Sequence, residues 1–160
     1  MNISDFLVNT KIFSILLPEE IDLIKQLFVT EYVKENRTVF TEGEPGHALY
    51  IVVHGSVVIT KQLEGGKTKL LAQLGDGEVF GELALIDGNV RSATVKTAKE
   101  TSLLVFHVEK FAKLIQDAPY TAFKIIMQLA KLLSNRLRDT NDQVVDLVNF
   151  HLAMKQQQQP

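Results

Sequence analysis

The residues with the clearest chemical potential lie in one apolar stretch, FGELALIDGNVRSATV, residues 80–95. It carries one acid, Glu82, and one arginine, Arg91, with Gly81 and Gly88 beside them. Glycine lets a backbone approach a ligand closely, and a helix N-terminus presents unpaired N–H groups to an anion. If a short helix begins near Glu82, backbone amides there can hold a phosphate, and the Arg91 guanidinium can meet two phosphate oxygens.

Glu82 needs a different role, because its carboxylate would repel a phosphate. A sugar hydroxyl is the natural partner, since a carboxylate accepts hydrogen bonds. The combination therefore predicts a ligand that carries both a phosphate and a ribose hydroxyl. The residues alone leave a second interpretation open, in which Glu82 and Arg91 form a structural ion pair across a turn and Gly88-Asn89 is an ordinary loop.

Composition excludes several classes of protein. Hydrophobic residues make up 46% of the 160-residue chain and charged residues 22%, the balance of a folded domain. A net charge of −2 provides no basic field, so we expect no direct nucleic-acid partner. The absence of cysteine excludes disulfides and thiol-ligated metals. No apolar run is long enough for a membrane span and no signal peptide is visible, so a cytoplasmic location is expected.

The sequence shows no complete motif for a metal site, a nucleotide-triphosphate loop or a catalytic centre. The four histidines show no metal-ligand spacing, so no metal site is expected. Gly65-Gly66-Lys67-Thr68 resembles the end of a nucleotide-triphosphate loop, but Lys61 stands where that motif needs its first glycine. No Ser-His-Asp or paired-carboxylate arrangement is present in the sequence pattern. We therefore expect no enzyme and no catalytic residues.

The elements that must position the 80–95 stretch are mostly strands. Residues 1–27 have helical spacing, whereas residues 28–108 form short runs rich in Val, Ile, Thr and Tyr separated by glycine turns, including a hairpin turn at 63–67. This predicts an α+β fold in which an antiparallel β-roll or jelly-roll barrel forms the core. A one-turn helix fits around residues 82–85, inside the β region.

Residues 109–152 are predicted to be helical, with a short helix ended by Pro119 and a long helix to about Leu152. A heptad seam runs along the long helix, formed by Ile126, Ala130, Leu133, Leu137, Thr140, Val144 and Leu147. Such a seam predicts a homodimer through this helix. The alternative is that the helix packs back on its own β domain. Residues 153–160 are predicted to be a flexible tail.

The 80–95 stretch resembles the phosphate-binding cassette of the cyclic nucleotide-binding domain family. The match is Phe-Gly-Glu-Leu-Ala-Leu-Ile at 80–86 and Arg-Ser-Ala-Thr-Val at 91–95, and Val90 departs from it where some members have proline. Upstream, Glu-Gly-Glu-Pro-Gly at 42–46 resembles the family's early strands. The resemblance covers residues 10–150 and implies a jelly-roll core closed by C-terminal helices.

The resemblance also implies roles for individual residues. Gly81 provides backbone contact, Glu82 binds the ribose 2′-hydroxyl and Arg91 binds the cyclic phosphate. The remaining implied contacts are the main-chain N–H groups of Leu83 and Ala84, the lining residues Ser92 and Ala93, and the base contacts Thr140 and Asn141. These last two are equally consistent with polar positions of a coiled helix.

A cyclic nucleotide sensor that signals through movement of the C-terminal helix is therefore the function we expect. Cyclic AMP is the expected ligand, with cyclic GMP possible, because guanine-selective members tend to have threonine where Ser92 stands. Two alternatives stay open: a dimerisation module with a vestigial pocket, and the sensor part of a transcription regulator whose DNA-binding domain lies elsewhere. The downstream partner is not identified by the sequence.

Overall fold

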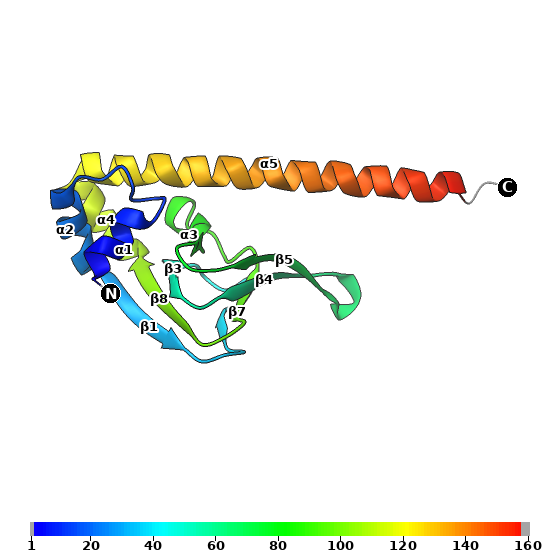
Figure 1. The fold of residues 1–160 in the computed structure, drawn as a ribbon, viewed down its shortest axis with the longest axis horizontal. Coiled ribbons are helices and arrows are strands. Elements are labelled where there is room, and N and C mark those ends of the chain that lie inside the picture. The colour runs from blue at the N-terminus through cyan, green and yellow to red at the C-terminus, as the bar shows by residue number, and fades with distance from the viewer. Residues whose placement is uncertain (1, 158–160) are drawn as a thin grey trace.

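The computed structural model describes residues 2–157, and Figure 1 shows their arrangement. The helices are α1 (Ile3–Asn9), α2 (Pro18–Ile24), η1 (Lys25–Leu27), η2 (Glu64–Gly66), α3 (Leu83–Ile86), α4 (Val108–Asp117) and α5 (Pro119–Gln157). The strands are β1 (Phe28–Val33), β2 (Thr38–Phe40), β3 (Ala48–His54), β4 (Val57–Gln62), β5 (Thr68–Leu74), β6 (Val79–Phe80), β7 (Thr94–Thr97) and β8 (Thr101–His107). Of the predicted flexible tail, residues 153–157 continue helix α5, and residues 158–160 lie outside the described residues.

The strands form two antiparallel four-stranded sheets, with orders β1-β8-β3-β6 and β2-β7-β4-β5. Consecutive strands β3 and β4 lie in different sheets, and β7 and β8 do the same, so the chain alternates between the two layers. The predicted antiparallel β core with N-terminal helices and a long C-terminal helix is confirmed. In the described residues, the two sheets remain separate rather than closing into a barrel.

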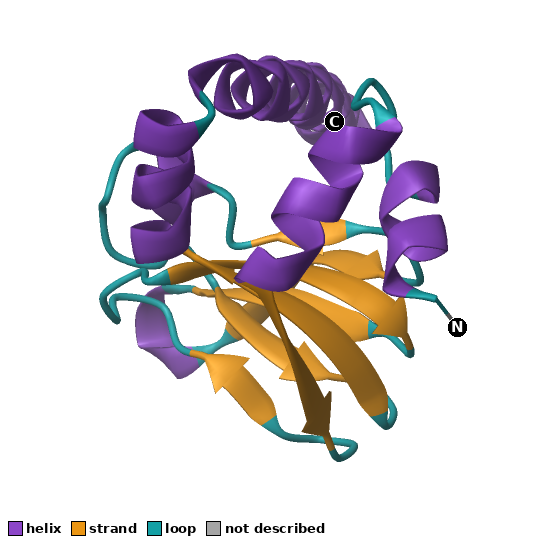
Figure 2. Ribbon diagram, turned by 90° about the vertical axis from the view of Figure 1, so that its left-hand side faces the viewer, coloured by secondary structure: helices purple, strands orange, loops and turns teal. Residues whose placement is uncertain are grey.

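Apolar side chains fill two adjoining cores. One lies between the β1-β8-β3-β6 sheet and the helices that cover it, and it includes Phe13, Ile51, Phe106 and Leu129. Figure 2 shows these helices gathered on one side of the strands. The other core lies between the two sheets and includes Phe40, Val57 and Phe80. The second core also includes Val95, so both ends of the cassette, residues 80–95, are buried in it.

An ionic contact fastens the N-terminal helices to the start of α5. Both oxygens of Glu20 on α2 accept bonds from α5, one from the Thr121 hydroxyl at 3.0 Å and one from the Lys124 ammonium at 2.7 Å. Burial raises the pKa of Glu20, but the bonds from Lys124, the Leu17 N–H and Thr121 outweigh it and leave the pKa below its usual value. The first turns of α5 are therefore held against α2.

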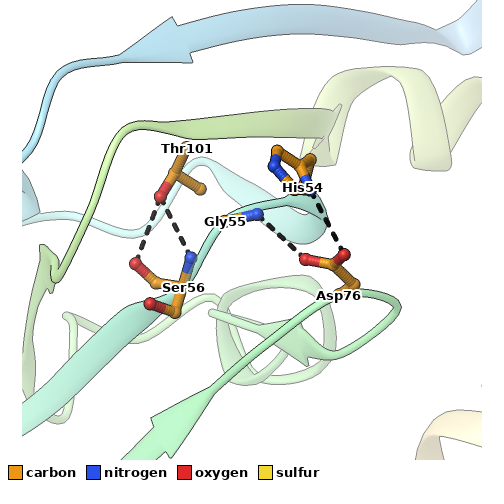
Figure 3. A network of polar contacts seen from close by, with 5 residues as sticks. All are labelled: His54, Gly55, Ser56, Asp76 and Thr101. Atoms are coloured by element: carbon orange, nitrogen blue, oxygen red, sulfur yellow. Dashed lines mark hydrogen bonds and ion pairs between the residues drawn. The ribbon is translucent and has the colours of Figure 1, made fainter.

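The turn between β3 and β4 is held by the side chains drawn in Figure 3. Asp76 accepts the Gly55 N–H at 2.9 Å and faces the exposed ring of His54 at 3.3 Å. The Thr101 hydroxyl exchanges hydrogen bonds with the backbone of Ser56. Gly55 has φ +117°, and a β-carbon on it would lie 2.5 Å from Thr101 Oγ1, so only glycine fits here. His54 thus lies at the edge of a turn and not in the core.

Helix α5 runs the length of the molecule, past the tip of the β4–β5 hairpin (Figure 1). It begins at Pro119, one residue after a break at Ala118, because proline suits the first turn of a helix. Its first half packs on the body of the domain, whereas its second half is exposed. Within residues 2–157, no helix combines the length and the apolar character that a membrane crossing requires.

Candidate functional site

The turn from β6 into α3 requires a glycine. Gly81 has φ +71°, and a β-carbon on it would lie 2.8 Å from Arg91 Nη1 and 3.2 Å from the Ala48 carbonyl oxygen. Any other residue would be strained and would push against the arginine. Helix α3 then starts at Leu83, as predicted, and the first N–H groups of a helix have no partner inside it.

Arg91 lies under this turn with only 6% of its surface exposed. Its Nη1 donates to the carbonyl oxygens of Ala48 at 2.9 Å and Gly81 at 3.1 Å, and Cζ lies 4.0 Å from the centroid of the Phe40 ring. Burial lowers the pKa of Arg91, an effect that the nearby Tyr50 opposes. Its Nε is buried without a hydrogen-bond partner in the described residues. A buried cation with unused donors is suited to an anionic ligand.

Glu82 is as deeply buried as Arg91, with 5% of its surface exposed, but its partner is a different arginine. Arg136, on α5, donates from Nη1 to Glu82 Oε1 at 2.8 Å and from Nη2 to the Val79 carbonyl oxygen. The interpretation of Glu82 and Arg91 as an ion pair with each other is wrong, since Glu82 pairs with Arg136 instead. Glu82 Oε2 has no hydrogen bond within the described residues, so it is available to accept one.

A cavity of about 950 Å³ lies between the cassette, the β4–β5 hairpin and α5. This is within the range of roughly 300–1,000 Å³ for small-molecule sites. The cassette contributes its polar floor, with Glu82 and Arg91, and α5 forms the opposite wall. Apolar side chains supply most of the rest: Phe40, Ile59, Leu71, Ala72, Leu74, Phe80, Val90, Val95, Leu133, Leu137, Val144 and Leu147. The cavity therefore offers charge at one end and apolar surfaces along its length.

The structure brings most of the predicted site residues to this cavity. Those that line it are Gly81, Glu82, Leu83, Ala84, Arg91, Ser92, Ala93 and Thr140. Asn141 does not line it, whereas Gln143, two residues further along α5, does. The heptad seam also meets the cavity through Leu133, Leu137, Thr140, Val144 and Leu147. That part of the seam faces its own β domain.

Sequence reasoning missed Arg136. The available signal was its place four residues before Thr140, which puts the two side chains on one face of the helix. The Arg136 carbonyl oxygen in fact accepts the Thr140 hydroxyl at 2.8 Å. Nothing in the local pattern indicated that this face would meet Glu82.

Comparisons with known proteins agree with the geometry. A family model described as "Cyclic nucleotide-binding domain" matches residues 30–118. The chain is 37% identical over 142 residues to the cyclic AMP receptor protein of Thermus thermophilus, covering 89% of this chain and 63% of that protein. It is 35% identical over 126 residues to a CRP-like cAMP-activated global transcriptional regulator of Mycobacterium tuberculosis, covering 79% of this chain and 54% of the relative. It thus spans only half to two thirds of these relatives.

A solved structure of similar extent gives a matching fold. A cyclic nucleotide-binding domain from Methylobacillus flagellatus superposes with a TM-score of 0.81 at 25% sequence identity. The match covers 90% of this chain and 81% of that one. The similarity therefore includes the helices on both sides of the β core.

Proposed function

The chain belongs to the cyclic nucleotide-binding domain family, and from this premise we propose that it is a regulatory module that binds cyclic AMP in the cavity between the cassette and α5. The observation that carries the proposal is the buried guanidinium of Arg91, held against Gly81 with its Nε unpaired. A buried arginine with unused donors beside a backbone turn is suited to a singly charged cyclic phosphate.

In this proposal the sugar of the ligand lies against Glu82. Its Oε2 accepts the ribose 2′-hydroxyl while Oε1 stays on Arg136. The Glu82–Arg136 pair neutralises the carboxylate near the phosphate, so the cavity floor keeps the positive charge of Arg91. The N–H groups of Leu83 and Ala84, at the start of α3, face the same end of the ligand, next to Ser92 and Ala93.

The base lies further along the cavity, between the apolar side chains of β4 and β5 and the face of α5 that carries Leu133 and Thr140. The Thr140 hydroxyl is the polar group of α5 best placed to meet a base edge, with Gln143 one turn further on. The preference for adenine over guanine rests on Ser92 standing where guanine-selective members tend to have threonine, and on the names of the two relatives above.

Output is proposed to pass through α5, because Arg136 joins that helix directly to the residue that receives the ribose. Ligand contacts that differ between two positions of α5 would shift the helix toward one of them. A homodimer through α5 is part of the proposal, since large apolar side chains remain exposed along it in the single chain. Outside the cavity lining they are Phe123, Ile126, Met127, Val145, Val148, Phe150, Leu152 and Met154, between 38% and 64% exposed.

Calorimetric titration with cyclic AMP and with cyclic GMP tests the proposal. We expect saturable binding of one ligand per chain, with cyclic AMP the tighter. Hydrogen exchange of residues 120–150 with and without the ligand tests the movement of α5, and identical protection would count against it. Failure to bind either nucleotide at millimolar concentration would overturn the ligand assignment.

A second candidate function is the sensor region of a transcription regulator, favoured by the similarity to the cAMP-activated global transcriptional regulator of Mycobacterium tuberculosis. It makes the same prediction for nucleotide binding and differs only in the output. An interaction module with a vestigial pocket makes the opposite prediction, because such a module would associate without binding a nucleotide. The same titration, combined with sedimentation, separates this last candidate from the other two.

A further inference from the structure

Lys61 lies on the cavity wall formed by β4, two residues after Ile59 and therefore on the same face of the strand. Its Nζ lies 2.6 Å from the carbonyl oxygen of Ser92 and 2.7 Å from Oε1 of Glu42. These two contacts connect the loop before β3, strand β4 and the end of the cassette. We call the three residues the Glu42–Lys61–Ser92 tether.

The Ser92 carbonyl needs a donor from outside the sheet. The pairing of β4 with β7 ends at Thr60 and Thr94, so the backbone two residues before Thr94 lies beyond the ladder. The Lys61 ammonium provides the donor that a further ladder N–H would have provided. Ser92 is also the residue directly after Arg91, so this bond is made one residue from the proposed phosphate ligand.

The other side of the same backbone is held as well. The Arg91 N–H donates to the Glu44 carbonyl at 2.8 Å, and the Gly43 N–H donates to the Arg91 carbonyl at 2.9 Å. Main-chain bonds therefore fix Arg91 from the loop before β3, and a lysine side chain fixes Ser92 from β4. The segment between them is restrained from two directions.

Glu42 keeps the Lys61 ammonium in place. Its Oε1 faces Nζ, its Oε2 accepts the Gln62 N–H at 3.2 Å, and its own N–H donates to the Thr94 hydroxyl at 3.0 Å. The hydrogen bond from Lys61 is the main reason that the pKa of Glu42 is below its usual value. The tether thus closes back on Thr94, two residues after Ser92.

The contribution of the tether to folding stability is expected to be small. The side chains of Lys61 and Glu42 are 43% and 28% exposed, and ion pairs this accessible to water add little to stability. Their effect is local, on the orientation of the backbone at Ser92. Lys61 is therefore expected to affect the geometry of the ligand site rather than the stability of the fold.

We propose that Lys61 is a positioning residue of the ligand site. By holding the Ser92 carbonyl it sets the direction of the Ser92 hydroxyl and of the Arg91 backbone, in the orientation that receives the phosphate of the ligand. The inference rests on the proposed function and deepens it. Lys69 provides a comparison, because it lies opposite Lys61 on β5 and lines the same cavity. Within residues 2–157, the ammonium of Lys69 makes no ion pair or hydrogen bond, unlike that of Lys61.

Three variants test the proposal by titration with cyclic AMP: Lys61→Met, Lys61→Arg and Lys69→Met. We expect Lys61→Met to weaken binding by about tenfold, the effect of losing one hydrogen bond that involves a charged group. Lys61→Arg retains donors and charge, so it should recover most of the affinity. Lys69→Met removes the same charge from the same wall and should leave affinity within about twofold of the wild type. An equal loss in both methionine variants would overturn the proposal, because it would indicate a general effect of charge.

A double-mutant cycle with Ser92→Ala asks whether Lys61 acts through Ser92. If it does, Ser92→Ala should cost less affinity in the Lys61→Met background than in the wild type, because the hydroxyl is already misplaced there. Strictly additive losses that vanish at high salt would contradict the positioning role.

Hydrogen exchange of residues 90–95 in the nucleotide-free protein tests the tether independently of binding. Exchange should be faster in Lys61→Met and unchanged in Lys69→Met, while the thermal midpoint of both variants stays near that of the wild type. Unchanged exchange, or a large fall in the midpoint of Lys61→Met alone, would overturn the positioning role. If wild type binds no cyclic nucleotide, the proposed function fails, and faster exchange in Lys61→Met would still support the tether.

Discussion

The guanidinium of Arg136 lies 2.8 Å from the carboxylate of Glu82, so the long C-terminal helix contacts the cassette at the residue proposed to receive the ribose. The two residues are 54 positions apart in the chain. Arg136 also donates to the Val79 carbonyl, and this fixes its planar head between β6 and α3. This contact is the reason we propose that α5 responds to a ligand bound at Glu82.

Arg136→Met should weaken cyclic AMP binding by about 1.5–3 kcal/mol, the range for a hydrogen bond to a charged group, because Glu82 would be left buried without its partner. It should also speed hydrogen exchange in α5 around residue 136. Arg138→Met is the matched control, since Arg138 is exposed and bonds only to the neighbouring Asn135 in the described residues. Equal effects of the two variants in the titration would contradict the role of Arg136.

Arg91→Ala should weaken binding by about 2–5 kcal/mol, as expected for removing one member of a buried charge pair formed with the ligand phosphate. Arg91→Lys keeps the charge but loses the planar pair of donors, so it should recover only part of this loss. Arg37→Ala removes an exposed arginine that does not line the cavity and serves as the control. A loss below tenfold for Arg91→Ala in calorimetry would show that Arg91 does not bind the phosphate.

Gly81→Ala should lower both folding stability and nucleotide affinity. The left-handed backbone alone costs a non-glycine residue about 1–2 kcal/mol, and the new β-carbon would also press on Arg91 Nη1. Gly65→Ala isolates the first effect, because Gly65 has a similar φ of +75° but nothing within 4 Å of its β-carbon position. Chemical denaturation measures the stability of both variants, and titration measures their nucleotide affinity. If Gly81 serves only as a turn, the two variants should lose the same stability and Gly81→Ala should keep its affinity.

The Glu20 contact predicts a loss of stability in acid. The pKa of Glu20 in the folded chain lies below its ordinary value of 4.5, so its contribution to stability is present above that pH and is lost as pH falls through the lower folded value. The stability difference between wild type and Glu20→Gln should therefore shrink below pH 4.5. Urea unfolding from pH 7 to pH 3 measures this. Glu19→Gln, at the exposed neighbouring position, is the control for removing one carboxylate from α2.

If the proposed dimer forms, Val148→Asp should dissociate it. The new carboxylate would lie among the exposed apolar side chains of α5 that the interface buries. Asn149→Asp adds the same charge one residue further along, on a different side of the helix, and should leave the dimer intact. Sedimentation equilibrium checks both variants. A monomeric wild type at tens of micromolar would refute the dimer without affecting the nucleotide proposal.

Features that depend on neighbouring residues could be predicted from the sequence. Strand-rich runs with glycine turns predicted the β core, and the hairpin at 63–67 and the short helix near Glu82 lie where the local pattern indicated. The sequence indicated close backbone approach at Gly81, whereas its φ of +71° and the nearness of Arg91 and Ala48 are properties of the folded chain. The chemical types of Glu82 and Arg91 predicted a ligand with a hydroxyl and a phosphate, but they left open a structural ion pair between the two residues.

Contacts between residues distant in the chain became known only from the folded structure. Helical spacing predicted that Leu133, Leu137 and Thr140 share a face, but it could not tell whether that face meets a partner or the protein's own cavity. The pairing of Glu82 with Arg136 and of Ser92 with Lys61 likewise has no local signature. The physical reason is that periodicity reports which side chains point the same way, whereas the surface they meet is set by packing between segments far apart in the chain.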